Sequence, residues 1–311
     1  MSKLTLFRRS TQILFLLLIV VIPILNLIPI RDYFEVEYGS FNLEIQEIAK
    51  EATTFDRFYG WIKSTPLSDL ATRIGENVQG SPWAFKVFGV TIVDPLTALS
   101  TFFLSGSIIP SLLFAALPLV FLSIFLGRVF CGYICPMHPF LESNAWIRAK
   151  LEGFGFQFHE IEFSRNNRYH LLGIGLVFSY IFSVQLLPSI YPPAVIPREI
   201  FHYSFYGTVG FGTLFILFVM VTEIAISRRW WCTYFCPGGL LYSLLGSMRG
   251  VRVALEEGKC DHCAKCDDVC PYKLEPSSGN LIGNQCDNCG LCIASCETNG
   301  LDFKFGFQKV G

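Results

Sequence analysis

Two cysteine runs near the end of the chain decide the fold of that part of the molecule. The first reads Cys260-x-x-Cys263-x-x-Cys266-x-x-x-Cys270-Pro271, and the second reads Cys286-x-x-Cys289-x-x-Cys292-x-x-x-Cys296. In such a run three closely spaced thiolates hold three corners of a [4Fe–4S] cubane, and the fourth reaches a neighbouring cluster. The spacing therefore predicts two [4Fe–4S] clusters, the first held by Cys260, Cys263, Cys266 and Cys296 and the second by Cys286, Cys289, Cys292 and Cys270.

Residues 255–311 are accordingly predicted to form a ferredoxin-like domain with two [4Fe–4S] clusters. A pair of zinc sites built from Cys-x-x-Cys knuckles is the alternative for the same residues. Glu297 follows Cys296 where the pattern would carry proline, and its charge could lower the potential of the adjacent cluster. All twelve cysteines lie in closely spaced groups, which favours metal sites over disulfides.

The composition of the remaining chain indicates a membrane protein. Hydrophobic residues make up 52% of the 311 residues and charged residues only 16%, whereas about a quarter of an ordinary soluble chain is charged. The net charge of -1 gives no basic excess with which to neutralise phosphates, so nucleic acid is excluded as a partner.

Four apolar segments are predicted to be transmembrane helices, and they make the fold class an α-helical membrane protein. They are Thr11–Ile30, Ile108–Gly127, Leu171–Ile190 and Gly207–Ile226, and Leu96–Leu104 is predicted to be an interfacial or re-entrant piece. The first segment has twenty uncharged residues, longer than the core of a signal peptide, and is interpreted as a retained anchor. The chain thus divides into residues 1–30 with the first helix, a periplasmic loop 31–95, helices 2–4 in residues 96–254, and the domain 255–311.

Lysines and arginines gather before the first span, between the second and third, and after the fourth. Positive residues favour the cytoplasmic side, so both termini are predicted to be cytoplasmic in a multi-pass protein of the bacterial inner membrane. The loop Arg31–Pro95 and a short turn at Tyr191–Phe205 are then predicted to lie outside.

A second cysteine pattern is repeated at an offset of 101 residues. Arg128-Val-Phe-Cys131-Gly-Tyr133-Ile-Cys135-Pro136 matches Arg229-Trp-Trp-Cys232-Thr-Tyr234-Phe-Cys236-Pro237, each copy at the cytoplasmic end of a predicted span. Cysteines at i and i+4 share a helix face, so the paired repeats could form one site of four cysteines for a further Fe–S cluster or a metal. Arg128, Arg229, Tyr133 and Tyr234 would surround it. Inert buried cysteines and ordinary interfacial anchors are the alternatives.

Together these features resemble the NapH family. The resemblance is carried by the short anchor, the step Val93-Asp94-Pro95-Leu96, the two Cys-x-x-x-Cys-Pro motifs and the terminal double cysteine run. It implies the membrane quinol-dehydrogenase component, of ferredoxin type, of a periplasmic nitrate reductase system. Such a subunit takes electrons from the membrane quinone pool and passes them to a periplasmic iron–sulfur or cytochrome c partner.

Quinol oxidation needs a proton acceptor beside an apolar pocket. The candidates are Asp94, Glu199 and His202 at the outer face, and His138 and Glu223 at the inner face. Glu223 falls within an apolar span, where a carboxylate is a functional candidate, although it is also close enough to Arg228 to form an ion pair. A redox sensor or an assembly factor for a periplasmic metalloenzyme is the alternative function, and a non-redox membrane anchor is a third.

Overall fold

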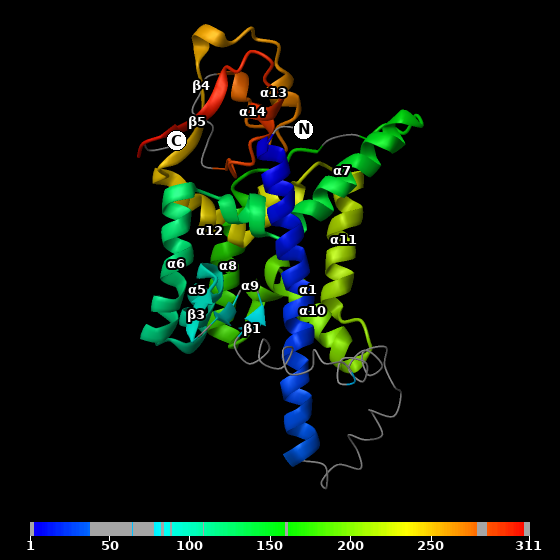
Figure 1. Cartoon of the computed structure of the whole chain (residues 1–311), viewed down its shortest axis with the longest axis vertical. Helices are drawn as coiled ribbons and strands as arrows, with labels where there is room; N and C mark the ends of the chain where they lie inside the picture. The colour runs from blue at the N-terminus through cyan, green and yellow to red at the C-terminus, as the bar shows by residue number, and fades with distance from the viewer. Residues whose placement is uncertain are drawn as a thin grey trace.

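The computed structural model describes residues 3–37, 64, 78–81, 84–87, 89–107, 109–158, 161–278 and 285–307. The described chain is mostly helical, and several long helices run side by side beneath a small carboxyl-terminal domain (Figure 1). Most of the predicted outer loop 31–95 lies outside the described residues.

Helix α1 (Lys3–Glu37) begins before the predicted first span and continues beyond it. Within the described residues, its segment Leu4–Ile22 is the one helix that by length and composition could cross a membrane. Helices α6 (Pro110–Leu126), α8 (Asn167–Phe182) and α11 (Phe211–Ala225) have 17, 16 and 15 residues. At ~1.5 Å per residue they are shorter than a hydrocarbon core of ~30 Å. The first of the four predicted spans alone meets the length criterion, so the other three stay predictions.

Two expectations about the following segments were wrong. Leu171–Ile190 is not one helix, because α8 ends at Phe182, Ser183 takes a left-handed conformation with φ 53°, and α9 (Leu186–Ser189) follows. Tyr191–Phe205 is not a short turn but helix α10 (Pro192–Tyr206), whose first residue is a proline that is already shaped for a helix start.

The segment predicted as an interfacial or re-entrant piece is a separate helix, α5 (Pro95–Ser105). The Asp94 side chain caps its first turn by accepting a hydrogen bond from the Leu96 N–H at 2.8 Å. Gly106 ends it in the left-handed conformation, with φ 62°, before α6 begins. Asp94 is thereby fixed at the point where the chain enters the helical part of the molecule.

The remaining elements are short. Strands β1 (Val78–Ser81), β2 (Ala84–Val87) and β3 (Val90–Val93) form an antiparallel sheet in the order β1-β2-β3. The Cys-x-x-x-Cys segments are π-helical turns η1 (Phe130–Ile134) and η2 (Trp231–Phe235), followed by α7 (Met137–Gly153) and α12 (Pro237–Leu245). The 3₁₀ turn η3 (Gly246–Met248) follows α12 directly and contacts α6. The carboxyl-terminal domain consists of strands β4 (Val251–Leu255) and β5 (Leu301–Phe305), helices α13 (Lys265–Asp268) and α14 (Leu291–Ser295), and the 3₁₀ turns η4 (Glu257–Lys259) and η5 (Pro276–Ser278).

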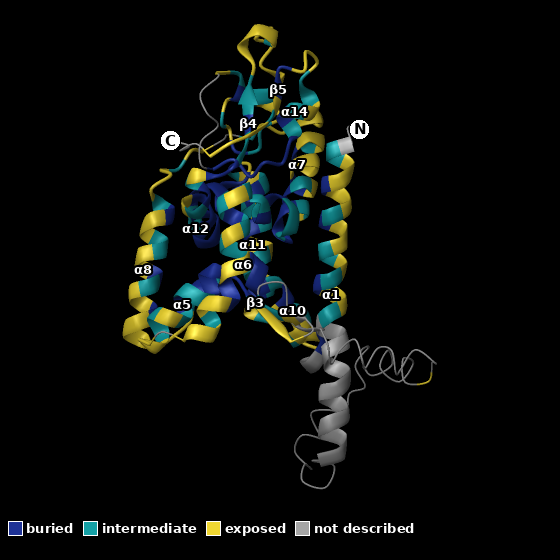
Figure 2. Cartoon of the chain, turned by 60° about the vertical axis from the view of Figure 1, so that its left-hand side comes forward, coloured by how far each residue is buried: buried dark blue, intermediate teal, exposed yellow. Residues whose placement is uncertain are grey.

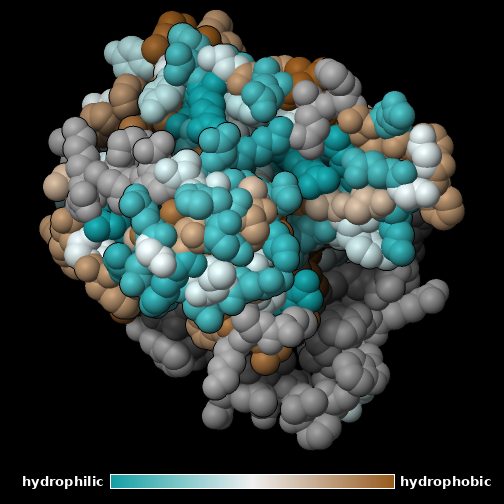
Figure 3. Space-filling view, turned by 90° about the horizontal axis from the view of Figure 1, so that it is seen from above, coloured by the Kyte–Doolittle hydropathy of each residue, from teal (hydrophilic) through white to brown (hydrophobic). Residues whose placement is uncertain are grey.

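Strand β4 pairs with β5 in antiparallel register, from Val251 opposite Phe305 to Leu255 opposite Leu301. This pairing brings the end of the described chain back to the start of the carboxyl-terminal domain. The amino end of α1 lies at the same end of the molecule (Figure 1). Seen from above, this end is largely hydrophilic (Figure 3).

The largest core lies where the π-helical turns meet α10, α11 and α12. It includes Phe130, Leu141, Tyr191, Trp231 and Tyr242, all buried. By contrast, large apolar side chains on the outer faces of the long helices are exposed, among them Phe121, Val177 and Phe218 (Figure 2). The cysteine turns thus lie in the best-packed part of the molecule.

Candidate metal centres

The two cysteine loops of the carboxyl-terminal domain have the same backbone conformation. In the first loop His262 and Ala264 flank Cys263 with positive φ, and in the second Asn288 and Gly290 flank Cys289 in the same way. Alternation of right- and left-handed residues turns successive N–H groups inward and forms the anion-binding concavities found around Fe–S centres. The backbone of both loops therefore fits the predicted clusters.

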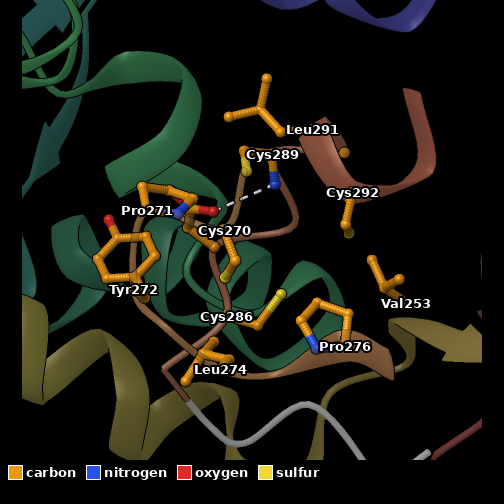
Figure 4. Close-up of a pocket in the computed structure, with 12 residues that line it drawn as sticks. Val253, Cys270, Pro271, Tyr272, Leu274, Pro276, Cys286, Cys289, Leu291 and Cys292 are labelled. Atoms are coloured by element: carbon orange, nitrogen blue, oxygen red, sulfur yellow. Dashed lines mark hydrogen bonds between the residues drawn. The ribbon is translucent and has the colours of Figure 1, made fainter. Parts of the chain in front are cut away.

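One cavity gathers all four cysteines predicted to hold the second cluster. Cys270 comes from the first run, whereas Cys286, Cys289 and Cys292 come from the second, and the four line one pocket (Figure 4). Val253, Leu274, Pro276 and Leu291 form its apolar wall. Burial raises the pKa of Cys286 to about 11, so an anionic ligand set here needs a metal centre to stabilise the thiolates.

The cysteines predicted to hold the first cluster are nearer the surface. Cys263 is exposed, and Cys260, Cys266 and Cys296 are half-buried. Burial, the Asp267 carboxylate and, more weakly, Cys296 raise the pKa of Cys266 to about 11. The Cys296 sulfur accepts a hydrogen bond from the Gly300 N–H at 3.3 Å. Cys266 and Cys296, thirty residues apart in the chain, are therefore close enough for Cys296 to act electrostatically on Cys266.

The charge of Glu297, which departs from the ferredoxin pattern, is partly balanced. Its Oε1 atom lies 2.6 Å from Lys265 Nζ, in an exposed ion pair. Exposed pairs contribute little to stability, but the lysine places a positive charge beside the carboxylate. The effect of Glu297 on the potential of the first cluster is therefore expected to be small.

The four cysteines of the repeated motif line a second cavity. Cys131 lies in η1 and Cys135 directly after it, and Cys232 and Cys236 stand in the same way to η2. The four share this cavity with Arg128, Arg229, His138 and Tyr272. Each pair is held in a π-helical turn instead of the predicted α-helical face, with the Cys135 N–H donating to Phe130 O at 2.9 Å and the Cys236 N–H donating to Trp231 O at 2.7 Å. Such turns are frequent at functional sites. Proline after each pair then starts the next helix.

The four thiols of this second cavity act on one another. Burial and, after it, the proximity of Cys131 raise the pKa of Cys236 to about 12. Burial and the proximity of Cys236 and Cys135 raise the pKa of Cys232. Among the described residues, no three His, Cys, Asp or Glu side chains lie close enough together to hold a single metal ion. Four cysteine sulfurs are soft ligands of the kind that suits an Fe–S centre.

The four residues predicted to surround this site divide into two groups. Arg128 and Arg229 line the cavity. Tyr133 instead donates its hydroxyl proton to the Asn288 carbonyl of the second ferredoxin loop, at 3.2 Å, and Tyr234 packs against Phe163 with ring centroids 5.8 Å apart. The tyrosines of the repeat therefore serve docking and packing.

The candidate proton acceptors have different partners, except that Glu223 and His138 both contact Arg229. Asp94 accepts hydrogen bonds from Tyr191 at 3.0 Å and Tyr242 at 2.6 Å. Glu199 accepts from Thr213 at 2.9 Å, His202 contacts the Thr208 carbonyl at 3.0 Å, and Glu223 accepts from the Arg229 backbone N–H. His138 contacts Arg229, Glu142 and the Cys131 carbonyl. The candidates do not converge on one site, and Asp94 is the most completely enclosed of them.

Sequence reasoning missed three residues at these sites. Tyr191 lines the second cavity and bonds Asp94, Tyr272 lines both cavities, and Asp287 lies buried in the second ferredoxin loop. Two carried a usable signal: Tyr272 follows a Cys-Pro pair, and Asp287 stands inside a Cys-x-x-Cys motif. Tyr191 carried none, because it belonged to the segment interpreted as a turn.

Comparison with known proteins bears on the same segments. Residues 108–154 and 208–254 each match a family described as a 4Fe-4S binding domain. The two matches contain the two Cys-x-x-x-Cys-Pro motifs and end before the carboxyl-terminal cysteine runs. No solved structure matches the chain.

Curated relatives match over most of the chain. The ferredoxin-type protein NapH of Haemophilus influenzae is 27% identical over 277 residues, covering 82% of this chain and 92% of the relative. NapH of Escherichia coli is 27% identical, covering 67% and 73%. The methylamine utilization ferredoxin-type protein MauN of Methylorubrum extorquens is 30% identical, covering 64% and 68%. The chain belongs to the NapH-like family of ferredoxin-type iron–sulfur electron-transfer proteins.

Proposed function

We propose that this chain is a membrane electron-transfer subunit that oxidises quinol and delivers the electrons, through iron–sulfur centres, to a periplasmic respiratory reductase system such as nitrate reductase. Its immediate acceptor would be a periplasmic iron–sulfur or cytochrome c subunit. The names of the relatives support the ferredoxin-type chemistry, and three sets of cysteines supply places for the centres. One-electron transfer is the chemistry that bound clusters add to the chain.

Three ligand sets are proposed. Cys260, Cys263, Cys266 and Cys296 hold the first ferredoxin cluster, Cys270, Cys286, Cys289 and Cys292 hold the second, and Cys131, Cys135, Cys232 and Cys236 hold a third centre at the repeated motif. The shared cavities support the last two sets, and the match of each repeat to a 4Fe-4S binding domain supports a cluster for the third.

A membrane setting with four spans and cytoplasmic termini is part of the proposal. Large apolar side chains are exposed on the long helices and form an apolar surface whose exposure to water is unfavourable. The lysine and arginine bias favours the end that carries the ferredoxin domain as the cytoplasmic one.

A quinol pocket is available between α5 and α6. A cavity of about 330 Å³ is lined by Pro95, Leu99, Phe102 and Leu113, among other mostly apolar residues. Asp94 directly precedes Pro95, which lines this cavity, and oxidation of a quinol requires a proton acceptor close to the bound quinol. Of the candidates, Asp94 is therefore proposed as the proton acceptor.

Tyr191 is the observation that carries this assignment. Its hydroxyl donates to Asp94 at 3.0 Å, and the same residue lines the cavity of the four paired cysteines. The proposed proton acceptor and the proposed entry centre thus share one buried side chain. No comparable link is seen from Glu199, whose described hydrogen-bond partner is Thr213.

Quinol reduction of the purified full-length protein tests the function. Addition of a reduced menaquinol or ubiquinol analogue should produce iron–sulfur electron paramagnetic resonance signals within seconds. Asp94→Asn should slow this reduction at least tenfold, because it removes the proton acceptor but keeps the shape, whereas Glu199→Gln should not. A protein with intact clusters that neither quinol reduces would refute quinol oxidation and favour the sensor or assembly function.

A further inference from the structure

Tyr272 forms the wall between the two buried cysteine cavities. It lines the cavity of Cys270 and Cys286 and also the cavity of Cys131 and Cys232, and among the described residues it is the one that the two cavities share. Its side chain is 4% exposed, and Figure 4 shows it directly after Pro271 beside the ferredoxin cavity. A single ring therefore separates the two proposed centres.

Two buried guanidinium groups contact this ring. The guanidinium carbon of Arg128 lies 5.3 Å from the Tyr272 ring centroid, and that of Arg229 lies 5.2 Å away. Arg229 Nη1 also donates to the Tyr272 hydroxyl at 3.3 Å. The two arginines occupy equivalent positions in the repeated motif, so each copy of the repeat supplies one cation to the tyrosine.

Both arginines interact with the paired cysteines and with the ferredoxin domain. Arg128 donates to the Gln285 carbonyl at 3.0 Å, next to Cys286, and its other terminal nitrogen lies 3.9 Å from Cys131 Sγ. Arg229 interacts electrostatically with Cys232 of the membrane pair and with Cys289 of the ferredoxin domain. The positive charge between the cavities is therefore shared by them.

The neighbouring carboxylates balance this charge only in part. Asp287 is buried, lies 3.8 Å from His138 Nδ1 and interacts electrostatically with both Arg128 and Arg229, so one carboxylate faces two arginines. Glu142 lies 2.7 Å from Arg8. Burial of a charge is costly unless a counter-charge is near. Clusters held by four thiolates carry net negative charge, so a centre in each cavity would supply the counter-charge that the two arginines lack.

We propose that Arg128 and Arg229, together with the Tyr272 ring that both contact, form a charged partition that sets the reduction potentials of both adjacent centres together. The inference rests on the ligand sets given under the proposed function. A positive charge close to a centre stabilises its reduced, more negative form, and at distances of a few ångströms inside a protein such a charge is worth a tenfold change or more in the reduction equilibrium.

Potentiometric titration of the full-length protein, followed by electron paramagnetic resonance, tests the partition. Arg229→Gln should make reduction about tenfold less favourable at two centres, a shift of about 59 mV for one electron. The two centres are the one at the paired cysteines and the second ferredoxin cluster, while the first ferredoxin cluster keeps its potential. Arg229→Lys keeps the charge and should restore most of both potentials.

Arg249→Gln is the matched control. Arg249 is also buried and donates to the Cys286 carbonyl at 2.6 Å, but it is not among the described residues that line the cavity of the paired cysteines. Its replacement should shift the second ferredoxin cluster alone. An Arg229→Gln variant that shifts only one centre, or neither, with both signals present, would overturn the proposal.

Two further readouts separate this inference from the proposed function. If Arg229→Gln loses either signal, Tyr272→Phe is measured in its place, because it removes only the hydroxyl that Arg229 contacts. A smaller shift in potential, of the same sign at both centres, supports the partition. A shift at one centre or at neither refutes it. If the wild-type protein shows only two cluster signals and about eight iron atoms, the third centre of the proposed function is refuted.

Discussion

Gly132 faces Asp287 so closely that a β-carbon added to the glycine would lie 3.1 Å from the Asp287 backbone carbonyl oxygen. Gly132 lies between the first pair of cysteines, and Asp287 lies in the second ferredoxin loop. The second copy of the motif carries Thr233 at the equivalent position. The repeat is therefore asymmetric at the point where the ferredoxin domain packs onto one copy.

Gly132→Ala should loosen this docking. The added methyl group would also lie 3.2 Å from the Asp287 carboxylate, and overpacking of this kind costs about 1–3 kcal/mol. Hydrogen–deuterium exchange of the segment around residues 285–290 should increase, and the thermal midpoint should fall. Gly153→Ala is the control, because nothing lies within 4 Å of its added methyl group. Equal exchange in the two variants would show that the close contact does not hold the domain in place.

Chelation should remove iron from the ferredoxin domain in two phases. Cys263 is exposed, whereas Cys286, Cys289 and Cys292 are each no more than 9% exposed. The first cluster should therefore be lost before the second when an iron chelator and a mild oxidant are added, and about four iron atoms should leave in the fast phase. Iron release followed by absorbance checks this order.

Cysteine variants identify the two phases. Cys296→Ser should abolish the fast phase, and Cys286→Ser should abolish the slow one. Release of all ferredoxin iron in a single phase would contradict the difference in burial between the two sites.

Local spacing predicted more of this molecule than apolar periodicity did. The cysteine run indicated that Cys270 joins the second set, and the structure brings it into that cavity, because the loop geometry is contained in a short stretch. Helix α10 was missed since two prolines in an apolar segment are typical of turns as well as helix starts. The partition around Tyr272 could not be predicted, because it depends on how a domain more than a hundred residues from Arg128 packs onto it.

Reporter fusions should divide the chain between two compartments. Fusions after Gly153 and Gly258 should be cytoplasmic, and fusions after Gly106 and Gly207 periplasmic, because lysines and arginines flank the former segments. Both reporter types, one active inside and one active outside, are needed at each site. A periplasmic carboxyl-terminal domain would place the ferredoxin clusters in the wrong compartment and refute the proposed topology.

The four cysteines of the repeated motif should behave as one unit. They line a single cavity, so replacing any one of Cys131, Cys135, Cys232 or Cys236 by Ser should reduce quinol-dependent electron transfer nearly as much as replacing all four, since members of one site are not additive. The eight ferredoxin cysteines are untouched, so about eight iron atoms should remain. Iron and turnover are measured on the same preparations, because misfolding alone would also lower activity. Thr233→Ser, inside the same turn as Cys232 and Cys236, is the control and should keep the full iron content. Single variants with normal turnover, in a protein whose iron equals that of the ferredoxin domain alone, would show that the pairs are structural and that electrons bypass them.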